Sequence, residues 1–311
     1  MSFTVSDAVL ARLEKLKDKL DKEGQNLELY LDHLYESDYV NYWDYINLDA
    51  LLSLQHPRTK YPDEKTFIIY HQITELYFRL IRNCIELIAD EKNLSAEFFI
   101  KQMKRVNNYF RHLTDSFSIM YEGMDREQFL AFRLALMPAS GFQSAQYRMI
   151  EIYSTDIHQL VSDSKRNELK TETDIEKLYA HLYWKQGATE LETGKKTLTL
   201  RQFEDKYDSG FLLSIDKWKS KNLFRKYESL SAEGLNNSEL KNVLREYDQL
   251  ANINWNLIHY RTAARYMERK PTDIAATGGT NWQKYLPPRF QRIIFFPQLW
   301  TDDEMKNWGS N

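Results

Sequence analysis

Glycine and proline are scarce in this chain, with 10 glycines and 7 prolines among 311 residues. Both residues interrupt regular structure, so a chain with few of them has few turn signals and favours long helices. Apolar side chains recur at helical spacing over several stretches, and no stretch alternates convincingly in the manner of a half-buried strand. The pattern therefore predicts an all-α fold.

The apolar spacing also indicates where the helices lie. The last long helix is expected to begin at Asn237 or Ser238 and to run to Pro271, with Leu257 and Ile258 on the same apolar stripe as the residues before them. Further helices are expected over residues 5–24, 48–55, 63–89, 95–117 and 143–161, with a shorter one from Asp125 to Pro138.

The domain organisation follows from the same pattern. Residues 30–47 are aromatic and irregular, and residues 162–235 are the most polar part of the chain. We expect residues 162–235 to form a helical excursion on a main body that comprises residues 42–161 and 236–300. Within the excursion, helical patches are expected over residues 175–186, 200–207 and 211–218. No internal repeat and no linker divides the sequence, so residues 1–311 are predicted to form a single domain.

Charge and cysteine content narrow the possible partners. With 42 basic and 45 acidic residues, the net charge of -3 gives no overall basic field for nucleic acid. No run of about 18 apolar residues predicts a membrane span, and the first residues do not resemble a secretory signal. Cys84 is the only cysteine, which excludes an internal disulfide and fits a reducing compartment. We therefore expect a cytoplasmic protein that binds neither nucleic acid nor membrane.

His71 and His259 each lie in a helix with an apolar face, where a lone histidine has no obvious structural task. Thr262 and Ala263 follow His259 by one helical turn, and such small side chains would leave room for a flat macrocycle. A neutral imidazole is the usual proximal ligand of haem iron. Phe67 precedes His71 by one turn, so His71 could form a hydrogen bond in a distal pocket. Taken alone, each is better explained as a core histidine bonded to a neighbour.

Three other features have open interpretations. His71 and Glu75 have the spacing of a metal-binding pair, but that spacing is common by chance. Arg133 shares a helix face with Phe129 and Leu136, so it needs an anionic partner or water; a substrate carboxylate or a protein carboxylate would serve equally well. Residues 275–280 form a glycine-containing loop that could approach a ligand, although it lacks the features of a phosphate loop.

These segments together resemble the tryptophan 2,3-dioxygenase family. The resemblance covers roughly residues 42–151 and 255–300, and its motifs occur in the family's order, which makes it specific. The segments that carry it are residues 42–55, residues 67–72, Phe132 and Arg133 followed by residues 140–148, His259 with Thr262 and Arg265, and residues 277–280.

The resemblance implies an all-helical fold of the tryptophan/indoleamine dioxygenase type that binds haem b and forms a homotetramer. By position, His259 resembles the proximal iron ligand and His71 the catalytic distal histidine that faces the indole N–H. Arg133 resembles the residue that binds the substrate carboxylate, and Thr277 the residue that holds the amino-acid end. Other matching positions are the pocket residues Phe67, Phe129, Leu136 and Ser140, and Tyr42, Tyr45 and Ile46 of an N-terminal segment that reaches into a neighbouring subunit's site.

The implied reaction is cleavage of the indole C2–C3 bond of L-tryptophan by O2, which gives N-formyl-L-kynurenine and begins tryptophan catabolism by the kynurenine route. Some positions depart from the family pattern: Phe129 stands where a tyrosine is common, Ala139 replaces a frequent serine, and residues 280–282 differ. An alternative is therefore a related haem enzyme that oxygenates a substituted tryptophan or another indole in secondary metabolism. A third is a haem-binding sensor or a helical interaction protein, which would need no residues for an amino-acid carboxylate.

Overall fold

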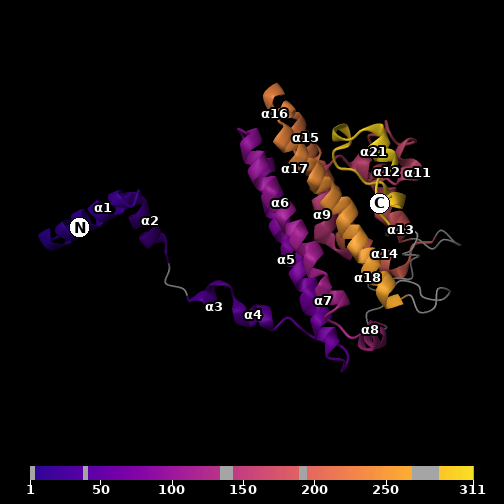
Figure 1. The fold of residues 1–311 in the computed structure, drawn as a ribbon, viewed down its shortest axis with the longest axis horizontal. Helices are drawn as coiled ribbons and strands as arrows, with labels where there is room; N and C mark the ends of the chain where they lie inside the picture. Colours follow the sequence, from indigo (N-terminus) through magenta and orange to yellow (C-terminus); the bar gives the residue numbers. More distant parts are fainter. Residues whose placement is uncertain (1–3, 38–40, 134–142, 189–194, 268–286, 311) are drawn as a thin grey trace. The chain divides into compact units, whose positions relative to one another are not determined.

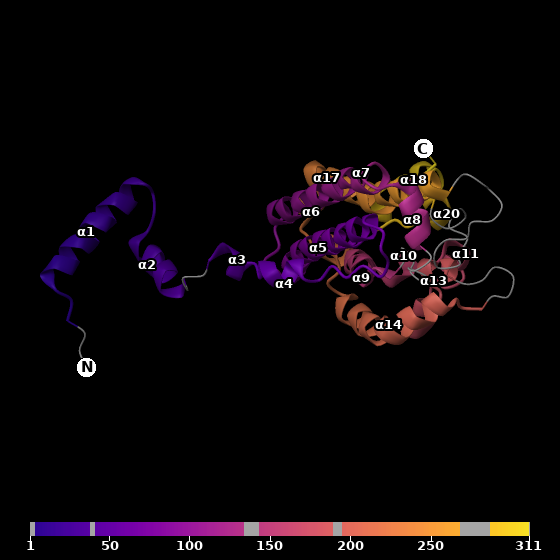
Figure 2. The same ribbon diagram turned by 90° about the horizontal axis from the view of Figure 1, so that it is seen from below.

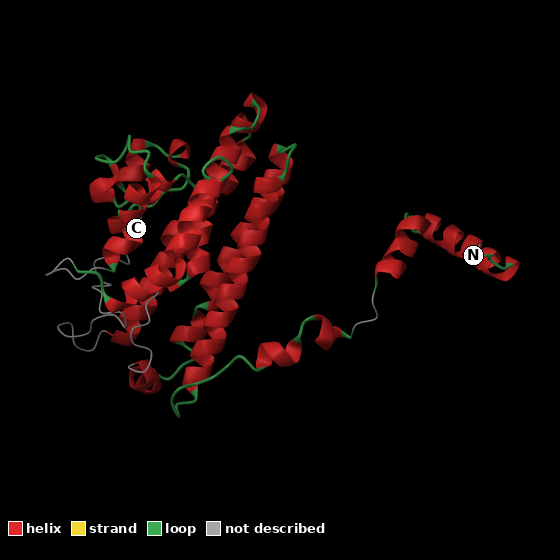
Figure 3. Cartoon of the chain, turned by 180° about the vertical axis from the view of Figure 1, so that it is seen from behind, coloured by secondary structure: helices red, strands yellow, loops and turns green. Residues whose placement is uncertain are grey.

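The computed structural model describes residues 4–37, 41–133, 143–188, 195–267 and 287–310. Throughout these residues the regular structure is helical, and no strand occurs in them (Figure 3). Val161 and Leu182 form one isolated antiparallel bridge. The all-α prediction is confirmed. No helix in the described ranges is long and apolar enough to cross a membrane.

Residues 1–55 form one of two compact units. The helices of this unit are α1 (Asp7–Lys22), α2 (Leu27–Glu36), α3 (Tyr42–Tyr45) and α4 (Leu48–Leu52). The stretch expected to be irregular thus holds two helices. Asn26 explains the first of them, because its side chain accepts a hydrogen bond from Leu29 N at 3.0 Å and caps the helix.

Residues 56–311 form the second unit, a bundle built around long helices. In Figure 1, α5 (Asp63–Asp90) and α6 (Ala96–Ser116) run beside α17 (Ser238–Gln249) and α18 (Trp255–Met267). Helix α9 (Ala145–Ser154) packs against both α5 and α14 (Leu198–Trp218); α14 lies along one side of the bundle in Figure 2.

The predicted helix starts are confirmed where side chains cap them. Ser95 Oγ accepts from Phe98 N at 3.1 Å before α6, and Asn237 Oδ1 accepts from Leu240 N at 3.0 Å before α17. Asp125 caps α8 (Arg126–Phe132). The end predicted for that helix, at Pro138, lies outside the described residues.

The polar region 162–235 contributes to the main core. Two helical patches were expected near residues 200–218, but α14 is continuous there because Phe203, Phe211 and Trp218 are all buried along it.

The prediction that all 311 residues form a single domain stays a prediction. The remaining helices are α7 (Ser118–Tyr121), α10 (Ile157–Leu160), α11 (Asp163–Arg166), α12 (Ile175–Ala180), α13 (Tyr183–Gly187), α15 (Leu223–Glu228), α16 (Ala232–Asn236), α20 (Pro288–Gln291), the 3₁₀ helix η4 (Pro297–Leu299) and α21 (Asp302–Lys306).

The last long helix departs from the predicted pattern. A π-helical turn, η3 (Leu250–Asn254), separates α17 from α18. A π turn shifts the phase of every residue that follows it. The turn therefore interrupts the apolar stripe expected through Leu257 and Ile258: both residues line a surface cavity, although Ile258 also packs against the core.

Candidate active site

The environment of His71 is aromatic. Phe67, one turn earlier on α5, places its ring 4.0 Å from the imidazole, and Phe129 and Phe132 of α8 lie 6.2 and 5.8 Å from the Phe67 ring. Tyr70 lies edge-on to the imidazole at 6.1 Å. The i,i+4 spacing of Phe67 and His71 brings both side chains to one face of α5, where α8 packs.

One hydrogen bond fixes the tautomer of His71. Its Nδ1 lies 2.7 Å from the backbone oxygen of Phe67. A carbonyl oxygen only accepts, so Nδ1 carries the proton and donates. Burial among protein atoms lowers the pKa of His71, which keeps the ring neutral at neutral pH. The ring nevertheless stays exposed to small molecules, so its Nε2 lone pair can accept a hydrogen bond from a ligand.

His259 lies at the other end of the same aromatic cluster. Its ring packs edge-on against Phe117 at 5.1 Å and against Trp255 at 5.5 Å, and Phe117 is itself 5.6 Å from Tyr70. Burial lowers the pKa of His259 to about 4, and a smaller repulsion comes from His71. The imidazole is therefore neutral at neutral pH, and no proton must be displaced before a metal binds it.

The two histidines belong to one site. They lie on different helices, α5 and α18, and a small repulsion from His71 contributes to the lowered pKa of His259. Tyr70 and Phe117 connect them through successive ring contacts. The structure thus brings together two residues that the sequence could only propose separately.

The metal pair of His71 and Glu75 gains no support. The Glu75 carboxylate accepts a hydrogen bond from Gln146 Nε2 at 3.0 Å. Within the described residues, no group of three or more histidine, cysteine, aspartate or glutamate side chains could hold a metal ion.

The residues around His259 fit a haem. Thr262, one turn further along α18, has a buried hydroxyl that finds no hydrogen-bond partner in the described structure. Its small side chain leaves room beside the imidazole, and Phe117 and Trp255 supply flat apolar surfaces. A neutral imidazole ligand on an apolar shelf is what a haem iron requires from the protein.

Arg133 follows α8 directly and its side chain is half-buried. Burial lowers the pKa of its guanidinium, but the group remains charged at any physiological pH. Phe129 lies one turn earlier on α8, and its ring is 6.2 Å from the ring of Phe67. Arg133 directly follows Phe132, whose ring lies 5.8 Å from the ring of Phe67.

The other predicted site residues lie either in the first unit or outside the described residues. Tyr42, Tyr45 and Ile46 belong to the first unit, where Tyr42 and Tyr45 are 72% and 78% exposed. Leu136, Ser140 and Thr277 lie outside the described residues.

Sequence reasoning missed three residues that shape the site. Tyr70, Phe117 and Trp255 form its aromatic surface between the two histidines. The spacing of Trp255, one turn before His259, repeats that of Phe67 before His71 and could have indicated it. No local signal marks Phe117, which reaches His259 through tertiary packing.

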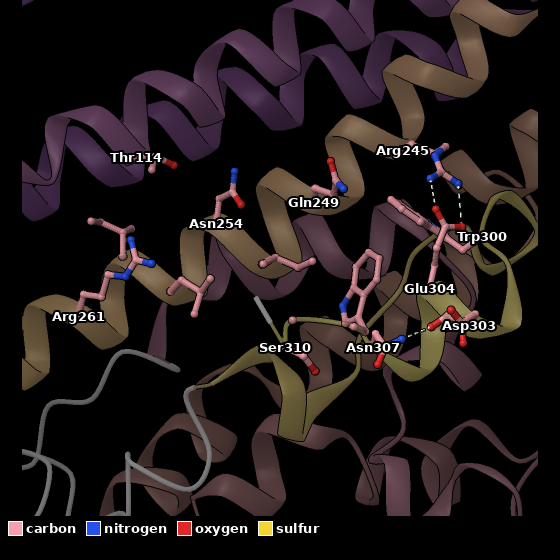
Figure 4. Close-up of a pocket in the computed structure, with 15 residues that line it drawn as sticks. Thr114, Arg245, Gln249, Asn254, Arg261, Trp300, Asp303, Glu304, Asn307 and Ser310 are labelled. Carbon is pink, nitrogen blue, oxygen red and sulfur yellow. Dashed lines mark hydrogen bonds and ion pairs between the residues drawn. The ribbon is translucent and has the colours of Figure 1, made fainter.

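A cavity lined by described residues lies elsewhere. It measures about 750 Å³ and runs between α17–α18 and the C-terminal residues 300–310 (Figure 4). Its lining includes Arg245, Gln249 and Arg261 but no histidine. We assign the site from the paired histidines, because chemistry at a metal or an indole needs such groups and cavity size alone does not supply them.

The fold and the candidate site describe a class of protein: a helical bundle in which two neutral histidines lie in one aromatic cluster. The profile of the family described as tryptophan 2,3-dioxygenase matches residues 32–270. The chain belongs to this family.

Individual relatives agree with the family match. The chain is 29% identical to tryptophan 2,3-dioxygenases of Ruegeria pomeroyi, over 281 residues, and of Bacillus thuringiensis subsp. konkukian, over 282 residues; each match covers 84% of this chain and 91% of the relative. It is 38% identical to the enzyme of Ruegeria sp. strain TM1040 over 117 residues, 37% of this chain. That stronger match spans only 41% of the relative's length.

Proposed function

We propose that this protein is a haem-dependent dioxygenase that uses O2 to cleave the indole C2–C3 bond of L-tryptophan, with N-formyl-L-kynurenine as product. The observation that carries the proposal is the pairing of neutral His71 and His259 in one aromatic site, in a member of the tryptophan 2,3-dioxygenase family. Haem, when bound, supplies the iron chemistry that activates O2.

The chain's own residues bind and orient the substrate. His259 is the proposed iron ligand, and its pKa of about 4 leaves the imidazole neutral and able to bind the iron. Arg133 binds the substrate carboxylate, and Phe67 and Phe129 form the apolar surface for the indole. Leu136, Ser140 and Thr277 complete the proposed substrate pocket. Holding the ring in one orientation contributes to the rate without any bond to the protein.

His71 has a positioning role in this proposal. Its Nδ1–H is already bonded to Phe67 O, so the free Nε2 accepts from the indole N–H and fixes the ring. The indole N–H is a very weak acid, and oxygen addition at a ring carbon does not require its prior removal. The lowered pKa of His71 keeps Nε2 unprotonated at neutral pH.

His71→Ala is therefore expected to be slowed but measurably active, because a misplaced ring lowers the rate without removing the chemistry. The measurement is turnover of L-tryptophan and of 1-methyltryptophan by parent and variant. The methylated compound cannot donate the hydrogen bond, so both proteins should turn it over at comparable, slow rates. A variant with normal haem and O2 binding but no turnover of either compound would mean that His71 moves a proton.

The direct test of the function mixes reduced, haem-loaded protein with L-tryptophan and air, and follows the absorbance and mass of formylkynurenine. The same assay with substituted tryptophans tests the alternative of a mono-oxygenase in secondary metabolism. A product that carries one added oxygen atom and an intact indole ring would favour that alternative.

We propose the cytoplasm as the location, because Cys84 is a free, buried thiol.

We further propose that the protein is a homotetramer in which residues 42–46 complete a neighbour's site. Both units leave apolar side chains exposed. On α5, exposed apolar residues recur at helical spacing: Ile69, Ile73, Leu76, Leu80 and Leu87. In residues 1–55, Leu20 is the one buried residue among those described, and Tyr42, Trp43 and Tyr45 are exposed. Exposed apolar surfaces of this extent are typical of subunit interfaces.

Complementation between variants tests the shared site. Tyr45→Ala and Arg133→Leu are each expected to be nearly inactive as pure oligomers. Co-expression should restore part of the activity, because some sites then combine an intact residue 45 from one subunit with an intact Arg133 from another. Mixed oligomers confirmed by native mass spectrometry that stay inactive would count against a shared site. Co-expression of Arg133→Leu with His259→Ala, which alter the same subunit's site, provides the control.

A further inference from the structure

The π turn at Leu250–Asn254 lies between the core face of α17 and His259. An α-helix advances by about 100° per residue, and a π turn accommodates one more residue than an α turn. Every residue after the turn is therefore rotated by roughly 100° relative to an unbroken helix.

The burial of individual residues shows this rotation. Tyr247 is fully buried on α17. In an unbroken α-helix, Arg261 would lie within about 40° of Tyr247 and His259 about 120° away from it. The structure has the opposite arrangement: Arg261 is exposed, while Trp255 and Thr262, which flank His259 on one helix face, are buried. The turn thus brings His259 onto the core face.

Side chains hold the turn in place. Tyr147 of α9 donates its hydroxyl proton to Ala251 O at 2.9 Å, and Asn256 Nδ2 donates to Asn252 O at 3.0 Å. Where an i→i+4 ladder meets an i→i+5 ladder, backbone carbonyls need donors from elsewhere. Tyr147 supplies one from a different helix, and it is itself buried.

A buried carboxylate anchors the start of the turn. Asp248 accepts from Asn252 Nδ2 at 2.8 Å, from Phe295 N at 2.8 Å, and from Phe296 N and Trp300 Nε1 at 3.1 Å each. The C-terminal segment is also joined to α17 by the ion pair of Arg245 with Glu304, which Figure 4 draws beside Trp300. These bonds join the start of the turn to the C-terminal segment, whereas the Tyr147 hydroxyl joins Ala251, within the turn, to α9.

We propose that Tyr147 is a positioning residue for His259: its hydrogen bond to Ala251 O stabilises the π turn that directs the imidazole into the site. The inference rests on the proposed function, because it takes His259 as the haem ligand. Tyr147 touches neither the proposed substrate nor the reacting atoms, so its effect on haem passes through the helix backbone.

Tyr147→Phe tests this with one hydroxyl removed from a ring that otherwise keeps its packing against Phe78. The matched control is Tyr247→Phe, which removes a buried hydroxyl bonded to Ser154 Oγ at 2.6 Å, again between the last long helix and α9 but before the turn. The readouts are the iron–histidine stretching band of the reduced protein, the rate of haem loss to an acceptor protein, and urea unfolding of the haem-free protein.

In Tyr147→Phe we expect a shifted iron–histidine band and about three- to tenfold faster haem loss, as the loss of one buried hydrogen bond implies. Tyr247→Phe should unfold at a lower urea concentration than the parent protein. Its iron–histidine band and its rate of haem loss should match those of the parent. Asn252→Ala removes the side-chain hydrogen bond from the turn to Asp248 of α17. It should shift the iron–histidine band as Tyr147→Phe does, and it replaces that variant if Tyr147→Phe does not fold.

Equal band shifts in Tyr147→Phe and Tyr247→Phe would overturn the proposal, because general loosening would then explain both. The proposal would also be overturned if Tyr147→Phe kept the iron–histidine band and the rate of haem loss of the parent protein. Failure of the proposed function is a separate outcome: the parent protein would then show no iron–histidine band that depends on His259.

Discussion

His259→Ala is expected to abolish stable haem binding. Within the described part of the chain, His259 combines a half-buried ring, a pKa lowered to about 4 that leaves it neutral at neutral pH, and the small neighbour Thr262 one turn away. Loss of a hydrogen-bonding partner of a metal ligand typically lowers metal affinity by about 10- to 100-fold, so loss of the ligand itself should exceed about 100-fold. The measurement is the Soret band of the purified protein and its titration with haem.

Two further variants make this result specific. His112→Ala removes an exposed histidine that stacks on Tyr77 of α5, and it should keep the parent Soret band. His259→Gly should recover haem binding when free imidazole is added, because the small molecule can occupy the vacated space. A His259→Ala protein with full haem content and activity would show that the iron has another ligand.

Arg133→Leu is expected to lower catalytic efficiency with L-tryptophan by about 10- to 150-fold, because a charge-assisted hydrogen bond contributes about 1.5–3 kcal/mol. Leucine keeps part of the side-chain volume next to the aromatic residues of α8 and removes only the charge. The measurement compares kcat/KM for L-tryptophan and for tryptamine, which lacks the carboxylate.

Tryptamine separates substrate binding from structure. It should be a poor substrate of the parent protein and lose little further in the variant, since the interaction that Arg133 provides is already missing. Arg126→Leu, at the first residue of the same helix, should leave both substrates unaffected. Equal losses for L-tryptophan and tryptamine in Arg133→Leu would mean that this arginine supports the fold instead.

Much of the fold could be predicted because the signals are local. The scarcity of glycine and proline, the apolar spacing of α5 and α6, and the capping residues Ser95 and Asn237 all act within a few residues of the structure that they determine. The same reasoning failed over residues 30–47, where dense aromatic side chains hid α2, and over α14, where burial against the bundle joins two weak helical patches.

The candidate site could be predicted in part, because its residues stand in ordered motifs. His71, Arg133 and His259 were each named from sequence, but each had an ordinary structural explanation when taken alone. What the sequence lacked was their proximity: the aromatic path from His71 through Tyr70 and Phe117 to His259 joins residues of α5, the end of α6 and α18.

The sequence by itself determined that the chain is helical and which histidines and arginine it offers to a ligand. The tertiary structure decided which face of the last helix His259 occupies. An unbroken helix would place Arg261 in the core and His259 outside it. Hydrogen bonds from Tyr147, distant in sequence, and from the C-terminal segment to Asp248 accompany the π turn that reverses this arrangement. Helical periodicity cannot predict such a turn, because the donors that stabilise it come from other parts of the fold.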